Sequence, residues 1–74
     1  MQVYVQNCKT HEYLGKDGNW TPRLNQALPF PTSADAVLHC TKADIDHAQV
    51  LLRFPREDLN LILPVDDDCR PPGS

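Results

Sequence analysis

Three segments whose side chains point alternately to two faces constrain this chain most. They are residues 2–6, 49–54 and 59–65, and in the first of them Val3 and Val5 share one face. A period of two is typical of a β-strand, because successive side chains of a strand lie on opposite sides of the sheet. The sequence therefore predicts a sheet built from both ends of the chain.

Two shorter strands are predicted between these segments. Residues 12–16 and 19–21 flank the pair Asp17-Gly18, which tolerates the positive φ angles of a tight hairpin turn. Pro22 follows directly and cannot donate a hydrogen bond to a neighbouring strand, so the second of these strands is expected to be short or to lie at an edge.

One helix is expected, over residues 34–40. Thr32 or Ser33 precedes it, and a hydroxyl at that position accepts a hydrogen bond from an otherwise unpaired backbone N–H. The helix presents a narrow apolar stripe formed by Ala36, Val37 and Cys40. A stripe of this width predicts that a single face of the helix packs against the sheet.

These elements predict an α+β fold in the order β-β-β-α-β-β, an antiparallel sheet of about five strands with one helix on one face. A chain of 74 residues is long enough for one domain only, so residues 1–65 are assigned to it and residues 66–74 to a flexible, acidic tail containing prolines. The strand order is left open. The helix is expected to cover the face that carries Val3, Val5, Val50, Leu52, Leu61 and Leu63.

The charge distribution argues against nucleic acid as a partner. The formal net charge is −3, and the acidic residues concentrate between residues 55 and 69. No basic stripe is present to displace counterions from a phosphate backbone. No apolar run approaches the roughly 20 residues that span a bilayer, so no membrane association is expected.

The cysteines favour a reducing compartment. There are three of them, and an odd number without a recognisable secretion signal argues against a disulfide framework. We therefore expect a cytoplasmic protein in which Cys8, Cys40 and Cys69 are thiols. Cys69, in the predicted tail, is expected to be the most accessible of the three.

Residues 4–36 follow the pattern Tyr-Val, Tyr-Leu, Gly-x-Trp-Thr, Ala-x-x-Phe-x-Thr and a helical Ala. In this chain the pattern is carried by Tyr4-Val5, Tyr13-Leu14, Gly18, Trp20-Thr21, Ala27, Phe30, Thr32 and Ala36. It resembles small uncharacterised proteins encoded by bacteria and phages. The resemblance implies no activity, and it implies a bacterial or mobile-element origin.

One set of residues offers an enzymatic alternative. Cys8, His11, His39 and Cys40 are the residue types of a zinc site or of a thiol nucleophile with its imidazole base. Cys40 and His39, however, point about 100° apart on a helix, and nothing in the sequence marks a cleft. We therefore expect no catalytic residue, no metal site and no cofactor, and keep a small thiol- or zinc-dependent enzyme as the alternative.

The sheet face opposite the helix is the predicted binding surface. Tyr4, Leu51 and Ile62 fall on it if all strands share one sheet, and Tyr13 is added as a further aromatic residue. An apolar face without a covering layer is typical of an interface. The sequence thus predicts a non-catalytic module that binds a protein or a second copy of itself, and leaves open whether Trp20 belongs to the core or to the interface.

Overall fold

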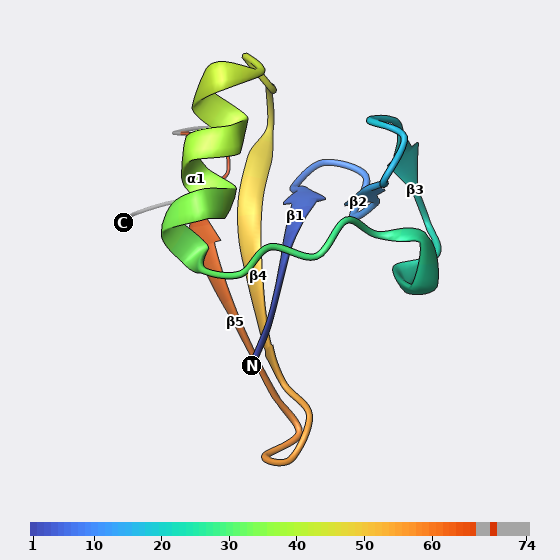
Figure 1. Cartoon of the computed structure of the whole chain (residues 1–74), viewed down its shortest axis with the longest axis vertical. Helices are drawn as coiled ribbons and strands as arrows, with labels where there is room; N and C mark the ends of the chain where they lie inside the picture. Colours follow the sequence, from blue (N-terminus) through green and yellow to red (C-terminus); the bar gives the residue numbers. More distant parts are fainter. Residues whose placement is uncertain (67–68, 70–74) are drawn as a thin grey trace.

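β1 (Gln2–Asn7) lies in the middle of a five-stranded antiparallel sheet with the order β3-β2-β1-β4-β5. This computed structural model describes residues 1–66 and 69, so most of the predicted tail lies outside the described residues. The other elements are β2 (Tyr13–Leu14), β3 (Trp20–Thr21), the 3-10 helix η1 (Leu24–Gln26), α1 (Ser33–Lys42), β4 (Ala48–Phe54) and β5 (Leu59–Pro64). Figure 1 shows α1 on one side of the long β4–β5 hairpin and the short strands on the other. The predicted fold class and element order are confirmed.

The core lies between α1 and the two central strands. Val3 pairs with Leu52 and Val5 with Val50, which places these side chains on one face. α1 meets that face through Ala36 and Cys40, which are 0% and 2% exposed. Small side chains let the helix approach the sheet closely, so the valines beneath it are fully buried.

The helix covers less of the sheet than the sequence predicted. Leu61 and Leu63 lie on the same face as Val50, yet they remain 45% and 42% exposed. A helix is about 10–12 Å wide and strands lie about 4.8 Å apart, so one helix covers about two strands. α1 covers β1 and β4, and β5 is left uncovered.

The short strands and the connection after them close the other side of β1. Tyr13 of β2 pairs with Gln6, and further down the strand Phe30 donates its backbone N–H to Val3 at 2.9 Å. The predicted hairpin turn is present, with Gly18 at φ +87°. Trp20 is partly buried against the core, which places it among the packed residues.

α1 begins at the predicted cap. The Thr32 hydroxyl accepts a hydrogen bond from the Asp35 backbone N–H at 3.1 Å, and it donates to the Asp35 carboxylate at the same distance. The acidic side chain also lies in the first turn, where the helix dipole favours negative charge. No helix among the described residues is long and apolar enough to cross a membrane.

A disulfide joins the end of β1 to the segment that follows β5. Cys8 is bonded to Cys69, so the expectation of three thiols and of an accessible Cys69 thiol is wrong. The two cysteines meet because β1 and β5 both run alongside β4 and antiparallel to it, which brings their C-terminal ends to the same end of the sheet. Cys40 is the free cysteine, and it is buried.

Candidate protein-binding edge

The predicted interface residues share one face of the sheet. A single row across β1, β4 and β5 is formed by Tyr4, Leu51 and Ile62. Tyr13 pairs with Gln6, which follows Tyr4 on the same face of β1. Their exposure differs from the expectation, since Leu51 is only 6% exposed whereas Ile62 is 50% exposed. Leu51 lies between Tyr4 and Ile62 in this row, and a binding surface on this face would rest on Ile62 and the partly exposed tyrosines.

Two buried glutamines occupy the next row of the same face. Gln49 donates its side-chain amide to the Gln6 side-chain oxygen at 2.7 Å, and Gln6 donates in turn to the His11 carbonyl at 3.1 Å. Both glutamines are at least nine-tenths buried, and among the described residues no buried side-chain polar atom lacks a partner. This network is internally satisfied and offers nothing to a ligand.

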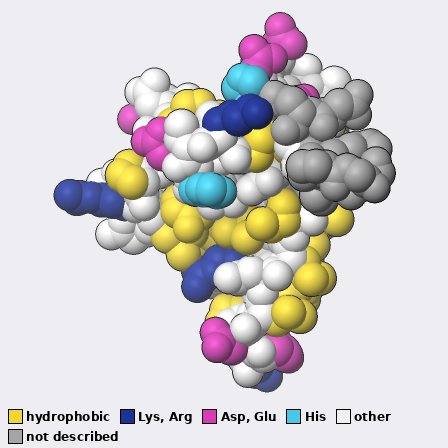
Figure 2. Space-filling model, turned by 180° about the vertical axis from the view of Figure 1, so that it is seen from behind, with side chains coloured by type: hydrophobic (Ala, Val, Ile, Leu, Met, Phe, Trp, Pro, Cys, Tyr) yellow, Lys and Arg dark blue, Asp and Glu magenta, His cyan; other side chains and the backbone are white. Residues whose placement is uncertain are grey.

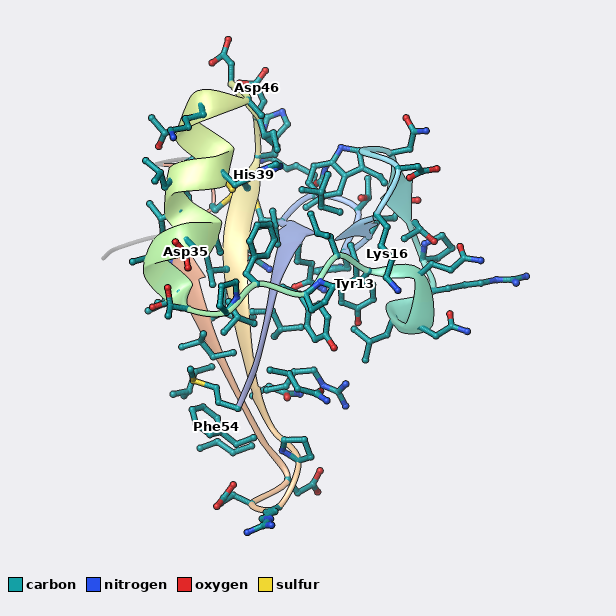
Figure 3. All side chains as sticks on the ribbon, in the orientation of Figure 1. Tyr13, Lys16, Asp35, His39, Asp46 and Phe54 are labelled. Carbon is teal, nitrogen blue, oxygen red and sulfur yellow. A yellow bond between two sulfur atoms is a disulfide. The ribbon has the colours of Figure 1, made fainter. Side chains whose placement is uncertain are left out.

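The residues of the enzymatic alternative do not form one site. Cys8 is held in the disulfide, and the His39 ring packs against the Phe30 ring with centroids 5.3 Å apart. Burial raises the pKa of the Cys40 thiol, and the nearby negative charge of Asp66 raises it further. Figure 3 shows His39 on α1, and within the described part of the chain no three metal-binding side chains converge.

The surface hollows add no reactive constellation. One of about 480 Å³ lies at the β2–β3 hairpin beside Trp20 and is lined mainly by polar side chains. A second, of about 530 Å³, lies beside Phe54 at the far end of the β4–β5 hairpin, a position visible in Figure 3. A third, of about 270 Å³, is lined by Phe30, Asp35, Leu38, His39 and Lys42 and contains no thiol or hydroxyl group.

β5 is the most exposed apolar element of the described chain. Its exposed apolar residues are Leu59 at 46%, Leu61 at 45%, Ile62 at 50% and Leu63 at 42%. The strand contains no charged residue. Figure 2 shows apolar side chains gathered in a band that continues along the hairpin to its charged tip.

The hydrogen bonds to β4 determine which backbone groups of β5 face outward. Val65 donates its N–H to the Ala48 carbonyl at 3.1 Å, and the register pairs Val50 with Leu63 and Leu52 with Leu61. Since inward and outward groups alternate along an antiparallel strand, the odd-numbered residues bond to β4. The N–H and C=O of Asn60 and Ile62, and the carbonyl of Pro64, therefore point away from the sheet.

The other edge of the sheet is protected. β3 has two residues, Pro22 follows it, and Phe30 occupies the part of β1 that β2 leaves free. Short strands, prolines and covering segments are the means by which proteins prevent unwanted strand pairing. β5 has six residues and, among the described residues, a hydrogen-bonded neighbour on one side only.

α1 extends the apolar surface beside β5. Its buried face carries Ala36, and Phe30, on the far side of β1 from β4, packs against His39. At 100° per residue, Val37 lies on the opposite flank of the helix from His39, which is the flank toward β5. Val37 is 38% exposed.

No protein-family model, curated protein or solved structure matches this chain. Leu61 and Leu63 were expected beneath the helix and are surface residues instead, and Leu59 was not singled out although it is exposed with them. The signal that could have found them is the absence of charge from residues 59–64, since edge strands are normally marked by charged side chains.

Proposed function

We propose that this chain is a non-catalytic protein-binding module that adds a strand of its partner to β5. The observation that supports the proposal is the pair of residues Asn60 and Ile62, whose backbone donors and acceptors face outward and have no partner among residues 1–66 and 69, on an uncharged edge strand. Strand addition is a recurring mode of recognition in which backbone bonds supply affinity and alternate side chains supply specificity.

The chemistry of the edge defines the chemistry of the partner. An added strand must be extended and free of proline where it meets the two donors. Its side chains on the α1 face would lie against Leu59, Leu61 and Leu63, and on the other face against Ile62. The partner strand is therefore apolar at alternate positions and uncharged.

The exposed area supports a moderate affinity. Fully burying a leucine is worth about 1.5–3 kcal/mol, so three leucines that are 42–46% exposed contribute roughly 2–4 kcal/mol from this chain. Each backbone bond adds about 1 kcal/mol. Because association costs several kcal/mol in lost freedom, we expect a Kd roughly between 1 μM and 1 mM.

The test removes one outward donor without touching the fold. Asn60→Pro deletes the N–H that faces away from β4 and loses no bond of the β4–β5 ladder. The probe is a fluorescent peptide of alternating Thr and Val flanked by lysines, with a Thr and Glu peptide as its charged counterpart. We expect the wild-type chain to bind the apolar peptide alone, and Asn60→Pro to abolish that binding while retaining the circular dichroism spectrum.

Leu61→Lys and Leu38→Lys form a matched pair of variants. Both leucines are about half exposed, at 45% and 50%, but only Leu61 belongs to β5. We expect Leu61→Lys to weaken peptide binding at least about tenfold, since a lysine on an edge strand discourages pairing, and Leu38→Lys to leave it unchanged. Equal effects of the two, or binding that persists in Asn60→Pro, would refute strand addition at β5.

The disulfide is relevant to the cellular compartment of the protein. Disulfides form and persist in oxidising compartments, so Cys8–Cys69 argues against the cytoplasmic location expected from the cysteine count. Alkylation of native protein before and after reduction, followed by mass spectrometry, decides whether this bond exists in the source cell.

A further inference from the structure

We infer that the strand added to β5 is β5 of a second copy of this chain, running antiparallel, with the two-fold axis at Leu61. The inference rests on the proposed function and specifies its partner. The resulting dimer has a continuous sheet in which the two β5 strands are the central neighbours.

The outward N–H and C=O groups of one β5 strand match those of a second, antiparallel copy. In this arrangement Asn60 of one copy faces Ile62 of the other, and both residues point their N–H and C=O outward. Each pair exchanges two hydrogen bonds, and symmetry repeats the pair, so all the outward donors of both strands are satisfied. Pro64, which has no N–H, falls outside these pairs.

In the same register, the leucines of one β5 strand face leucines of the second copy. Leu59, Leu61 and Leu63 are evenly spaced on the α1 face and similarly exposed. With the axis at Leu61, Leu61 faces its own copy and Leu59 faces Leu63 of the other copy. Leu61 then forms a non-hydrogen-bonded pair, in which side chains approach most closely.

The competing register places the axis at Ile62. It pairs Asn60 with Pro64 of the other copy, and the proline cannot donate to the outward carbonyl of Asn60. It also pairs Leu59 with Val65 of the second copy, although Val65 already packs against the core of its own chain. The register centred on Leu61 is therefore the better match.

Nothing described in the chain opposes this contact. β5 carries no charge, so two copies meet no like-charge repulsion within the strand. α1 lies over β1 and β4 and leaves the edge clear.

Single cysteine substitutions on β5 test the register. Leu61→Cys places two thiols in a directly opposed pair with Cα atoms about 4.5 Å apart, within the range of a disulfide. Leu63→Cys is the matched control, because its two copies would lie four residues apart along the strands, about 13 Å. The native cysteines interfere little, since Cys8 and Cys69 are paired and Cys40 is buried.

Under mild oxidation we expect Leu61→Cys to form a covalent dimer at least about tenfold faster than Leu63→Cys, with the 61–61 linkage confirmed by peptide mapping. Efficient linkage only in an equimolar mixture of the two variants would overturn the register in favour of the Ile62 axis. Fast linkage of Leu63→Cys alone would refute both registers.

Sedimentation of the wild-type chain separates this inference from the proposed function. We expect a concentration-dependent dimer that Asn60→Pro converts to monomer. A wild-type chain that stays monomeric up to about 1 mM and still binds the Thr and Val peptide would overturn the second copy as partner and leave strand addition intact. A wild-type chain that neither binds the Thr and Val peptide nor dimerises would overturn both proposals.

Discussion

Val65 donates its backbone N–H to the carbonyl of Ala48, 3.1 Å away, and this bond sets the hydrogen-bonding parity of all of β5. It turns the ring nitrogen of Pro64 away from β4, where the missing N–H costs no ladder bond. A slip of one residue would aim that nitrogen at β4 and move the leucines to the opposite face. The pairing of two residues at the end of the strand thereby decides which groups a partner can reach.

The buried glutamine pair should show energetic coupling. Gln49→Leu removes the donor to the Gln6 side-chain oxygen, which is then buried without a partner, and we expect a loss of about 1–3 kcal/mol in the free energy of unfolding. The double variant Gln6→Leu with Gln49→Leu should lose less than the sum of the two single variants, by about 1 kcal/mol or more. Urea unfolding of the four proteins measures the cycle, and strict additivity would show that the 2.7 Å contact carries no coupling.

Reduction should strongly destabilise the fold. The disulfide joins residues separated by 61 positions, and a loop of that length corresponds to about 4 kcal/mol in the chain-entropy model. A domain this small rarely has more than about 3–5 kcal/mol of net stability, so we expect a reducing agent to lower the guanidinium midpoint sharply. Cys8→Ser should reproduce the effect, and Cys40→Ala, which keeps the disulfide, should remain sensitive to the reductant. An unchanged midpoint after complete reduction would contradict the expectation.

The stability of the chain should fall in alkaline solution because of Cys40. Burial, assisted by Asp66, raises the pKa of this thiol in the folded state, so the folded chain holds the proton more tightly than the unfolded chain. The stabilisation is complete below the unfolded pKa of about 8.5 and is lost as the pH rises from there toward the folded pKa. Cys40→Ala should remove this part of the decline when unfolding is measured between about pH 7.5 and 10. A decline of the same slope in that variant would assign it to other groups.

Loss of the helix cap should cost about 1 kcal/mol. Thr32→Ala removes the hydroxyl that accepts from the Asp35 backbone N–H, whereas Thr32→Ser retains it. Thr41→Ala is the control, because that hydroxyl only donates to the Val37 carbonyl within the helix and alanine favours helix formation. When thermal unfolding of the three variants is measured, only Thr32→Ala should have a lower midpoint temperature than the wild-type chain.

The local features of the fold were predictable because neighbouring residues determine them. The alternation around Val3 and Val5, the turn at Gly18 and the cap at Thr32 all appear where the sequence placed them. Long-range features could not be predicted in this way, because the position of α1 across the sheet depends on which strands pair. The same reason explains Leu51, which was expected on the surface but is buried in β4, a strand with a neighbour on each side.

The sequence predicted an apolar protein-binding surface on the sheet face opposite the helix, whereas the candidate site is the edge strand β5. Ile62 lies on the exposed row that the sequence indicated, while Leu61 and Leu63 of β5 were assigned to the face beneath the helix. Their exposure follows from the strand order, which puts β5 at the edge, and no local pattern encodes that order. Cys8 and Cys69 were missed for the same reason, because their proximity exists only after the sheet has formed.

The disulfide also defines how the chain would carry a mechanical load. A force applied at the two ends enters through residues 1–7, crosses from Cys8 to Cys69, and leaves the chain without stretching the segment between them. Of the elements that the structure describes, only β1 lies in this path, so tension would peel β1 away from β4 while the other four strands and α1 stay shielded inside the covalent loop. Once the bond is reduced, the same force would extend the entire domain.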